Sequence, residues 1–288
     1  MRGASALTLA RPRDASQFER SAGEFLRACE AENNLPLGMI TALTAGPRRV
    51  DATPYFCVVR DGDRVAGVAM RLGLWLILAA GTRSAALPLI VDDAIRAQPE
   101  TPGIVGPKEL AREAVALWTA RTGVTARLGV AERIYRLERV LPPPPASGAP
   151  RVATTSDRVL LAGWFQSFVS ESIPGQDATY ETAQRNADGW IAGGGLWVWV
   201  DGAPVAMAGA GGRTPNGVRI SAVYTPPERR RRGYASALVA ALSQAQLDAG
   251  LKYCFLYTDL ANATSNRIYR NIGYEAVSDV DQYHFVPA

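Results

Sequence analysis

The sequence predicts an α/β (α+β) protein built of two similar domains in tandem, each a mixed sheet flanked by helices. One observation is the segment "LPPPPASGAP" at 141–150, whose four consecutive prolines are typical of a semi-rigid spacer and divide the 288 residues nearly in half. The other is that both halves repeat one order of expected elements: helix, helix, hairpin, strand, helix, strand, helix and strands. We therefore expect domains at 1–140 and 151–288, joined by a linker at 141–150.

The clearest element of the N-terminal half is a hairpin. The alternating segment "YFCVVRDGDRVAGVAMR" at 55–71 carries Asp61-Gly62, a dipeptide typical of a tight turn between two strands. The other expected elements are a helix at 15–31, a loop at 32–38, a strand at 74–80, a helix at 85–97, a strand at 103–106, a helix at 108–123 and the last strands at 126–140.

The C-terminal half repeats this order. Its hairpin at 195–212 turns at Asp201-Gly202. The other expected elements are helices at 157–172 and 179–191, a strand at 217–225, a helix at 232–249 closed by Gly250, a strand at 252–259, a helix at 263–272 ended by Gly273 and a final strand pair at 274–286.

Composition narrows the classes of function. The net charge of +4 is well below the Lys/Arg excess of a protein that coats nucleic acid. The single histidine, His284, excludes a His-cluster metal site, and the three scattered cysteines contain no Cys-x-x-Cys pair. The longest apolar run, at 72–81, is too short to cross a bilayer, and polar residues interrupt the N-terminal apolar stretch. We expect a cytoplasmic protein in a reducing compartment, with no metal, membrane or nucleic-acid partner.

Positive charge is concentrated in "TPPERRRRGYAS" at 225–236, where four arginines precede a glycine. Pro226 and Pro227 end the preceding strand because they donate no backbone hydrogen bond, and the helix at 232–249 follows. The arginines therefore lie at a helix N-terminus, where free N–H groups and the helix dipole favour an anion. Four cations are costly there unless something negative binds. A solvated charge run and a nucleic-acid tag are the alternatives, although a tag would not be embedded between a strand and a helix.

Two motifs carry a family resemblance. The loop reads Arg230, Arg231, Arg232, Gly233, Tyr234 and Ala235, and the later segment reads Asn262, Ser265, Ile268, Tyr269, Gly273 and Tyr274. The first resembles the (Gln/Arg)-x-x-Gly-x-(Gly/Ala) acetyl-CoA loop of the GNAT acyltransferase superfamily, and the second resembles that family's Asn-x-x-Ala-x-x-apolar-Tyr segment. The resemblance covers most of 150–288. It implies two tandem GNAT-like domains, each with a mixed, mostly antiparallel sheet.

The resemblance also implies roles for individual residues. Asn262, Ser265 and Tyr269 fall on one helical face, so an amide, a hydroxyl and a phenol could line a narrow channel. In the family, the Asn contacts the pantetheine arm and the Tyr protonates the departing thiolate, which a phenol is suited to do. The expected cofactor-binding residues are Val223, Tyr224, Thr225, Arg230, Arg231, Arg232, Gly233, Tyr234, Ala235, Ser236, Asn262 and Ser265, with Tyr269 catalytic.

The sequence departs from the family pattern in two places: Ser265 replaces the more usual Ala, and the strand before the loop lacks a glutamate. Arg219 and Ser221 stand in the strand where many such enzymes have a glutamate base, so the base stays open among Glu171, Asp259 and Tyr257. Glu171, Gln176 and Asp177 also lie where a substrate loop would meet an amine, although a solvated loop is an equal alternative.

The N-terminal half has neither motif. The segment "GTRSAALPL" at 81–89 lacks the loop pattern, and the helix at 108–123 lacks the Asn…Tyr pair. The resemblance to tandem GNAT enzymes implies that this half has lost cofactor binding and shapes the structure and the cleft.

The function expected from these features is transfer of an acetyl or other short acyl group from acetyl-CoA to a primary amine. The transfer is direct, in a ternary complex, because no Cys/His pair supports a covalent intermediate. The alternatives are a non-catalytic CoA-binding sensor or scaffold and, third, a basic nucleic-acid binder. The chain is expected to be a monomer or a homodimer, and the identity of the acceptor stays open.

Overall fold

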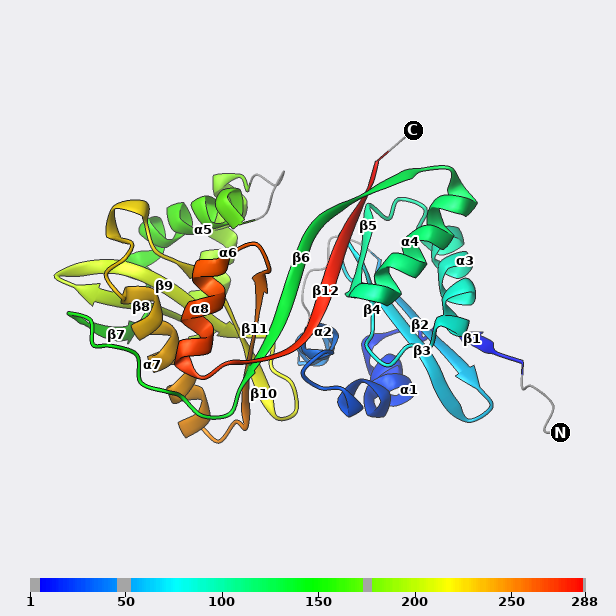
Figure 1. Ribbon diagram of the computed structural model, residues 1–288, viewed down its shortest axis with the longest axis horizontal. Helices are drawn as coiled ribbons and strands as arrows, with labels where there is room; N and C mark the ends of the chain where they lie inside the picture. The colour runs from blue at the N-terminus through cyan, green and yellow to red at the C-terminus, as the bar shows by residue number, and fades with distance from the viewer. Residues whose placement is uncertain (1–5, 46–52, 173–177, 287–288) are drawn as a thin grey trace.

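The computed structural model describes residues 6–45, 53–172 and 178–286. Its strands form one twelve-stranded sheet with the order β1-β2-β3-β4-β5-β12-β6-β11-β10-β9-β8-β7, which runs through both halves of the chain (Figure 1). The strands are β1 (Thr8–Ala10), β2 (Tyr55–Asp61), β3 (Arg64–Arg71), β4 (Leu76–Leu78), β5 (Gly103–Pro107), β6 (Thr125–Leu137), β7 (Ala149–Val152), β8 (Leu196–Asp201), β9 (Ala203–Gly211), β10 (Gly217–Tyr224), β11 (Tyr253–Asp259) and β12 (Glu275–Val286). Neighbouring strands are antiparallel except for the pairs β4–β5 and β10–β11.

Helices cover both faces of the sheet. They are α1 (Ala15–Ala28), α2 (Asn34–Thr44), α3 (Leu87–Ala97), α4 (Lys108–Thr122), α5 (Arg158–Ser172), α6 (Tyr180–Ala192), α7 (Tyr234–Asp248) and α8 (Ala263–Ile272), with short 3-10 turns η1 (Ser84–Ala86), η2 (Thr155–Asp157) and η3 (Pro227–Arg229). In the C-terminal half, one buried cluster joins α7 and α8 to the sheet and another joins α5 and α6 to it. In the N-terminal half, α3 and α4 belong to one cluster, and α1 and α2 to another. Among the described helices, none has the length and apolar character needed to cross a lipid bilayer.

The central strands are apolar runs rather than alternating ones because helices cover them on both sides. Residues 205–209 of β9, with the sequence VAMAG, are all buried, and so are residues 55–59 of β2. Each strand contributes side chains to two clusters: Val205 and Ala206 pack with α7, whereas Met207 packs with α5 and α6.

The two halves exchange strands at the centre of the sheet. β6, from the N-terminal half, pairs with β11 of the C-terminal half, from Leu137 opposite Cys254 to Glu132 opposite Asp259. β12, from the C-terminal half, pairs with β5 of the N-terminal half. β6 and β12 also pair with each other along their length (Figure 1). Each half thus supplies a strand to the sheet of the other.

This exchange corrects two expected elements. The segments at 126–140 and 274–286 were expected to hold several strands and a strand pair, but each forms one long strand. No glycine or proline within 274–286 starts a turn, and both segments are long enough to pair with partners in both halves.

The first two helices also differ from the expectation. α1 ends at Ala28 and α2 begins at Asn34, inside the segment 32–38 expected as a loop. The side chain of Asn33, which is buried, accepts a hydrogen bond from the Ala80 N–H (2.8 Å) and donates to the Leu26 carbonyl (3.1 Å). It therefore satisfies backbone groups of two neighbouring segments and fixes the turn between the helices.

Polar contacts hold the N-terminal half against the sheet of the C-terminal half. The Glu30 carboxylate accepts hydrogen bonds from the Thr214 hydroxyl (2.6 Å) and from both the backbone (2.8 Å) and side-chain (2.7 Å) N–H groups of Asn216. Asn34, at the start of α2, donates to the Tyr257 hydroxyl (3.3 Å). The start of α2 therefore lies over β10 and β11, where these strands begin to separate.

Candidate functional site

The site begins where two parallel strands of the C-terminal half part. β10 and β11 pair only from Gly217 opposite Tyr253 to Arg219 opposite Phe255, although both strands continue beyond these residues. A β-bulge lies between Ser221 and Tyr224, and Ala222 within it has a φ of 51°. A bulge bends its strand and increases the local twist. Residues 223–225 therefore pair with no residue of β11 and form the edge of the gap in the pairing.

The arginine loop leads from this edge into α7. The backbone N–H groups of 231–236 donate to no acceptor in the described part of the chain; the first bonded N–H is that of Ala237, to the Gly233 carbonyl (2.9 Å). Arg231 (φ 64°) and Gly233 (φ 82°) are both left-handed. A run of free N–H groups with alternating backbone handedness at a helix N-terminus forms an anion-binding concavity.

The loop is anchored from two sides. The Arg230 guanidinium donates to the Thr225 carbonyl (2.9 Å), forms an ion pair with Glu171 at the end of α5, and lies 5.8 Å from the centre of the Tyr224 ring. On the other side the Tyr234 hydroxyl, on a buried side chain, donates to Asp201 (2.5 Å). The Tyr234 side chain thus holds the loop in place, and the backbone N–H is the group of this residue that is free to bind a ligand.

The arginines at 231 and 232 extend the positive charge. Both side chains are exposed, and neither forms an ion pair within the described residues. Ala235 and Ser236, in the first turn of α7, are half-buried and small. These features fit a diphosphate, because free N–H groups and two exposed arginine side chains belong to one loop.

The second motif lies on α8. Asn262 is the N-cap of this helix rather than part of it, and its Oδ1 accepts the Ser265 N–H (3.0 Å). Ser265 is half-buried, whereas Tyr269 is 8% exposed and packs edge-on against Tyr274, with ring centres 6.0 Å apart. The three motif positions therefore run from the exposed end of α8 into the core.

Tyr269 packs on the face of the sheet that α7 and α8 cover. Its buried cluster also contains Ile220 and Leu256, the residues that follow the last paired positions of β10 and β11. Within the described residues its hydroxyl has no hydrogen-bond partner, and burial raises its pKa to about 12. Tyr269 therefore carries its proton at neutral pH and can donate it.

Comparison with known proteins decides the family of this half. Residues 161–274 match the model of the Acetyltransferase (GNAT) family. These residues form a GNAT domain. The match includes the bulged strand β10, the arginine loop and α8, the same segments that carry the expected motifs. No curated protein matches the sequence.

Solved structures extend the likeness in fold from the GNAT domain to the whole chain. A GCN5-related N-acetyltransferase from Sphaerobacter thermophilus has a TM-score of 0.62 at 16% identity and covers 98% of this chain and 96% of its own. A tandem GNAT protein from the clavulanic acid biosynthesis pathway has a TM-score of 0.59 at 15% identity, with 98% of both chains covered. A GNAT-family acetyltransferase from Colwellia psychrerythraea has a TM-score of 0.56 at 12% identity and covers 97% of this chain and 100% of its own. The predicted fold class is confirmed.

On the other face of the GNAT-domain sheet lies a polar group that includes one acid, Glu132, that the sequence did not indicate. Successive side chains of a strand alternate between faces, so Arg219, Tyr257 and Asp259 lie opposite to Ile220 and Leu256. Glu132, on the exchanged strand β6, is paired with Asp259 and shares this face. Burial raises the pKa of Glu132 to about 7; the charge of Asp259 adds to the rise and that of Arg219 opposes it.

The three base candidates named from the sequence have other partners. Glu171 accepts a hydrogen bond from the Tyr224 hydroxyl (3.0 Å) besides its ion pair with Arg230. Burial raises the pKa of Tyr257 far above neutrality. The Asp259 carboxylate accepts the Ala261 N–H (2.7 Å) in the turn before α8. Gln176 and Asp177 lie outside the described residues.

Most N–H groups of the equivalent turn of the N-terminal half have acceptors. The N–H groups of Thr82, Arg83 and Ala86 all donate to backbone carbonyls, and the Arg83 side chain pairs with Asp61 (2.8 Å). The helix that follows, α3, begins with Leu87 and has a proline in its first turn. A free N–H array like that of the GNAT domain is thus missing from this described turn.

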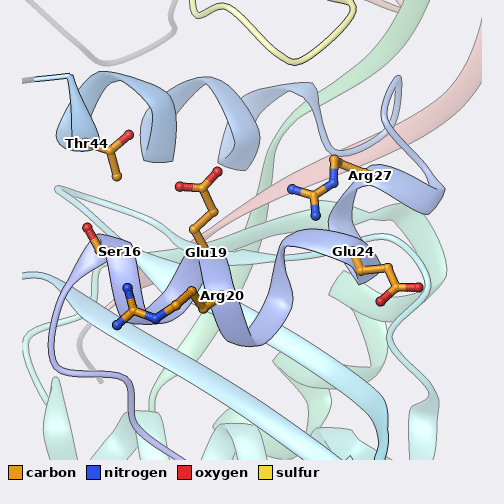
Figure 2. A pocket seen from close by; sticks show the side chains of 6 residues that line it. All are labelled: Ser16, Glu19, Arg20, Glu24, Arg27 and Thr44. Carbon is orange, nitrogen blue, oxygen red and sulfur yellow. The ribbon is translucent and has the colours of Figure 1, made fainter.

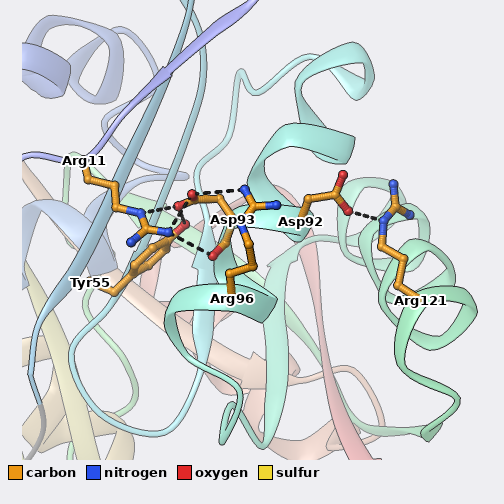
Figure 3. Close-up of polar contacts among 6 residues, drawn as sticks. All are labelled: Arg11, Tyr55, Asp92, Asp93, Arg96 and Arg121. Atoms are coloured by element: carbon orange, nitrogen blue, oxygen red, sulfur yellow. Dashed lines mark hydrogen bonds and ion pairs between the residues drawn. The ribbon is translucent and has the colours of Figure 1, made fainter.

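The acidic residues of α3 have structural partners instead. Asp93 is buried and accepts hydrogen bonds from the Arg11 guanidinium (2.7 Å) and the Tyr55 hydroxyl (2.9 Å), while Asp92 pairs with Arg121 (Figure 3). These contacts join β1, β2 and α4 to α3.

A hollow in this half lies between α1 and α2. It is lined by Ser16, Glu19, Arg20, Glu24, Arg27 and Thr44 (Figure 2). Its mixed charges converge on no single ligand chemistry. Within the described residues, no three His, Cys, Asp or Glu side chains are grouped to hold a metal ion.

Proposed function

We propose that this protein is an acyl-CoA-dependent N-acyltransferase, which moves an acetyl or other short acyl group directly to a primary amine. The observation that carries the proposal is the array of free N–H groups at 231–236, because it offers a diphosphate a complete set of donors beside two unpaired arginine side chains. The family match at 161–274 supports acyl transfer as the general chemistry.

In this proposal, the edge of β10 binds the extended arm of the thioester substrate. Residues 223–225 would pair with its amides as an added strand, because the bulge has separated them from β11. Asn262 and Ser265 would flank the arm at the start of α8. In this proposal, the binding residues expected from the sequence would line one path from the arginine loop to Tyr269.

Tyr269 would act as the general acid at the end of this path. The amine nitrogen forms a bond to the thioester carbonyl carbon, the carbon–sulfur bond breaks, and the Tyr269 hydroxyl gives its proton to the departing sulfur. A burial-raised pKa keeps this proton on the phenol until a thiolate, a stronger base than water, develops beside it.

The cytoplasm is the proposed location. Cys29, Cys57 and Cys254 are all free thiols, and two of them are buried, as suits a reducing compartment.

Tyr269→Phe tests the mechanism. We expect free-thiol release over a panel of amines to fall about 100-fold or more in kcat, since general acid catalysis contributes about 10²–10⁴-fold, with the Kd for CoA unchanged. Tyr274→Phe is the matched control: it removes another buried phenol oxygen, which hydrogen-bonds Ser243 (2.8 Å), and should leave kcat unchanged.

Three results separate the candidate functions. Undiminished transfer by Tyr269→Phe would remove this residue from the mechanism. CoA binding by the wild type without turnover on any amine would favour the non-catalytic sensor or scaffold. Salt-sensitive binding of DNA or RNA that acetyl-CoA does not displace would favour the nucleic-acid binder.

A further inference from the structure

Glu132 reaches the GNAT domain from the other half of the chain. It lies on β6, and its pairing with Asp259 places it beside the last residue of β11, beyond the point where β10 has separated. Its neighbour on β12 is Val280, an apolar residue. The exchanged strand thus brings one carboxylate to the part of β11 that no longer pairs with β10.

The Glu132 carboxylate is not used by the fold. Within the described residues it has no hydrogen bond or ion pair, although burial raises its pKa. The charged groups near it are Arg219 of β10 and Asp259 of β11. Tyr257 of β11 also lies near Glu132, and Glu32 before α2 lies near Tyr257. A partly buried carboxylate without a partner lowers stability, so its presence calls for a functional reason.

We propose that Glu132 is the general base of the acyl transfer, so that the N-terminal half completes the catalytic centre of the GNAT domain. This inference rests on the proposed function. The carboxylate takes one proton from the ammonium group of the acceptor and passes it to water, which frees the nitrogen lone pair for attack. After the C–N bond forms, the nitrogen releases a second proton to solvent. The Tyr269 oxygen, which has given its proton to the sulfur, takes a proton back from solvent.

The two faces of the sheet separate the acid from the base. Tyr269 shares a cluster with Ile220 and Leu256 on one face, whereas Glu132 lies with Tyr257 and Asp259 on the other. The acceptor would therefore enter from the face covered by the start of α2, and the sulfur would leave toward α8. Arg219 stands where a base was sought on β10, and its positive charge limits how far burial raises the pKa of Glu132.

Glu132→Gln in the full chain tests this assignment. We expect wild-type kcat/KM to fall on the acid side with an apparent pKa of about 7. The variant should lose about 100-fold or more in kcat at pH 7.5. Its rate should then rise tenfold per pH unit as the acceptor itself deprotonates. Glu132→Asp should keep the fall of kcat/KM on the acid side (the acid limb) and have a lower kcat. Glu138→Gln, which removes the exposed carboxylate that pairs with Arg136, should match the wild type.

Calorimetry with CoA distinguishes the possible failures. A Glu132→Gln variant with wild-type CoA affinity, wild-type kcat/KM and an unchanged acid limb would overturn the role of Glu132 while the proposed function stands. A wild-type protein that transfers to no amine would overturn both. If Glu132→Gln loses CoA affinity, the pH profile of Glu132→Asp tests the proposal. A fall of kcat/KM at low pH in Glu132→Asp supports the proposal. Full activity of Glu132→Asp without that fall contradicts it.

Discussion

Replacing Gly233 with alanine tests the anion loop at its tightest point. Gly233 has a φ of 82°, and a Cβ added there would lie 3.6 Å from the Cβ of Ala146, an ordinary contact. The substitution therefore adds no clash, and its cost is that of the left-handed backbone, about 1–2 kcal/mol for an L-residue. Gly233 is exposed and its N–H is unbonded, so we expect the ligand-free loop to relieve this strain by giving up the bond between the Ala237 N–H and the Gly233 carbonyl.

Binding would then have to restore the strained conformation. A cost of about 1–2 kcal/mol corresponds to about a 5–30-fold higher Kd for acetyl-CoA, measured by titration calorimetry. Gly250→Ala is the matched control, because Gly250 follows the other end of α7 with a φ of 91° and has no atom within 4 Å of an added Cβ. It introduces the same backbone strain away from the loop, and its Kd should equal that of the wild type.

Two results would refute this reasoning. If Gly233→Ala bound acetyl-CoA as tightly as the wild type, the loop would not need its left-handed residue to bind the diphosphate. If Gly250→Ala weakened binding equally, the effect would come from α7 as a whole and not from the N–H array.

Two further predictions concern stability and the division of the chain. Asp157 is buried and forms an ion pair with Arg151 (2.7 Å), and this hydrogen bond is the main cause that lowers the pKa of Asp157 to about 2. The lowered pKa corresponds to about 2 kcal/mol of folding stability. This stability is present above about pH 4 and is lost as the pH falls toward 2. Urea unfolding should therefore show Asp157→Asn less stable than the wild type at pH 7 but not near pH 2, and equal stability at pH 7 would contradict this. A fragment of residues 141–288 lacks β6, the partner of β11. We expect this fragment to bind no acetyl-CoA alone, but to bind it when it is coexpressed with residues 1–140. Normal binding by the fragment alone would show that the exchanged strand is dispensable.

Local signals predicted the elements that depend on neighbouring residues. The helix expected at 263–272 has those bounds as α8, with Asn262 as its cap. Both expected hairpins form, although Asp61 belongs to β2 and the turn lies one residue later. Proline, glycine and capping residues act within a few positions, so a single sequence is enough to reveal them.

The strand exchange could not be predicted in this way. β6 pairs with β11, more than a hundred residues later in the sequence, and no residue within β6 indicates which half it will join. Glu132 was missed for the same reason, since a single acid in a strand with several charged residues carries no local signal. The partners of Glu171 were equally out of reach, because Tyr224 and Arg230 meet it only through the packing of α5 on β10.

Titration of the wild-type protein with acetyl-CoA in a calorimeter tests the central claim most directly. The free N–H array of the GNAT domain, which the described turn of the N-terminal half does not repeat, predicts one molecule bound per chain. Absence of binding, or two molecules bound per chain, would contradict that account.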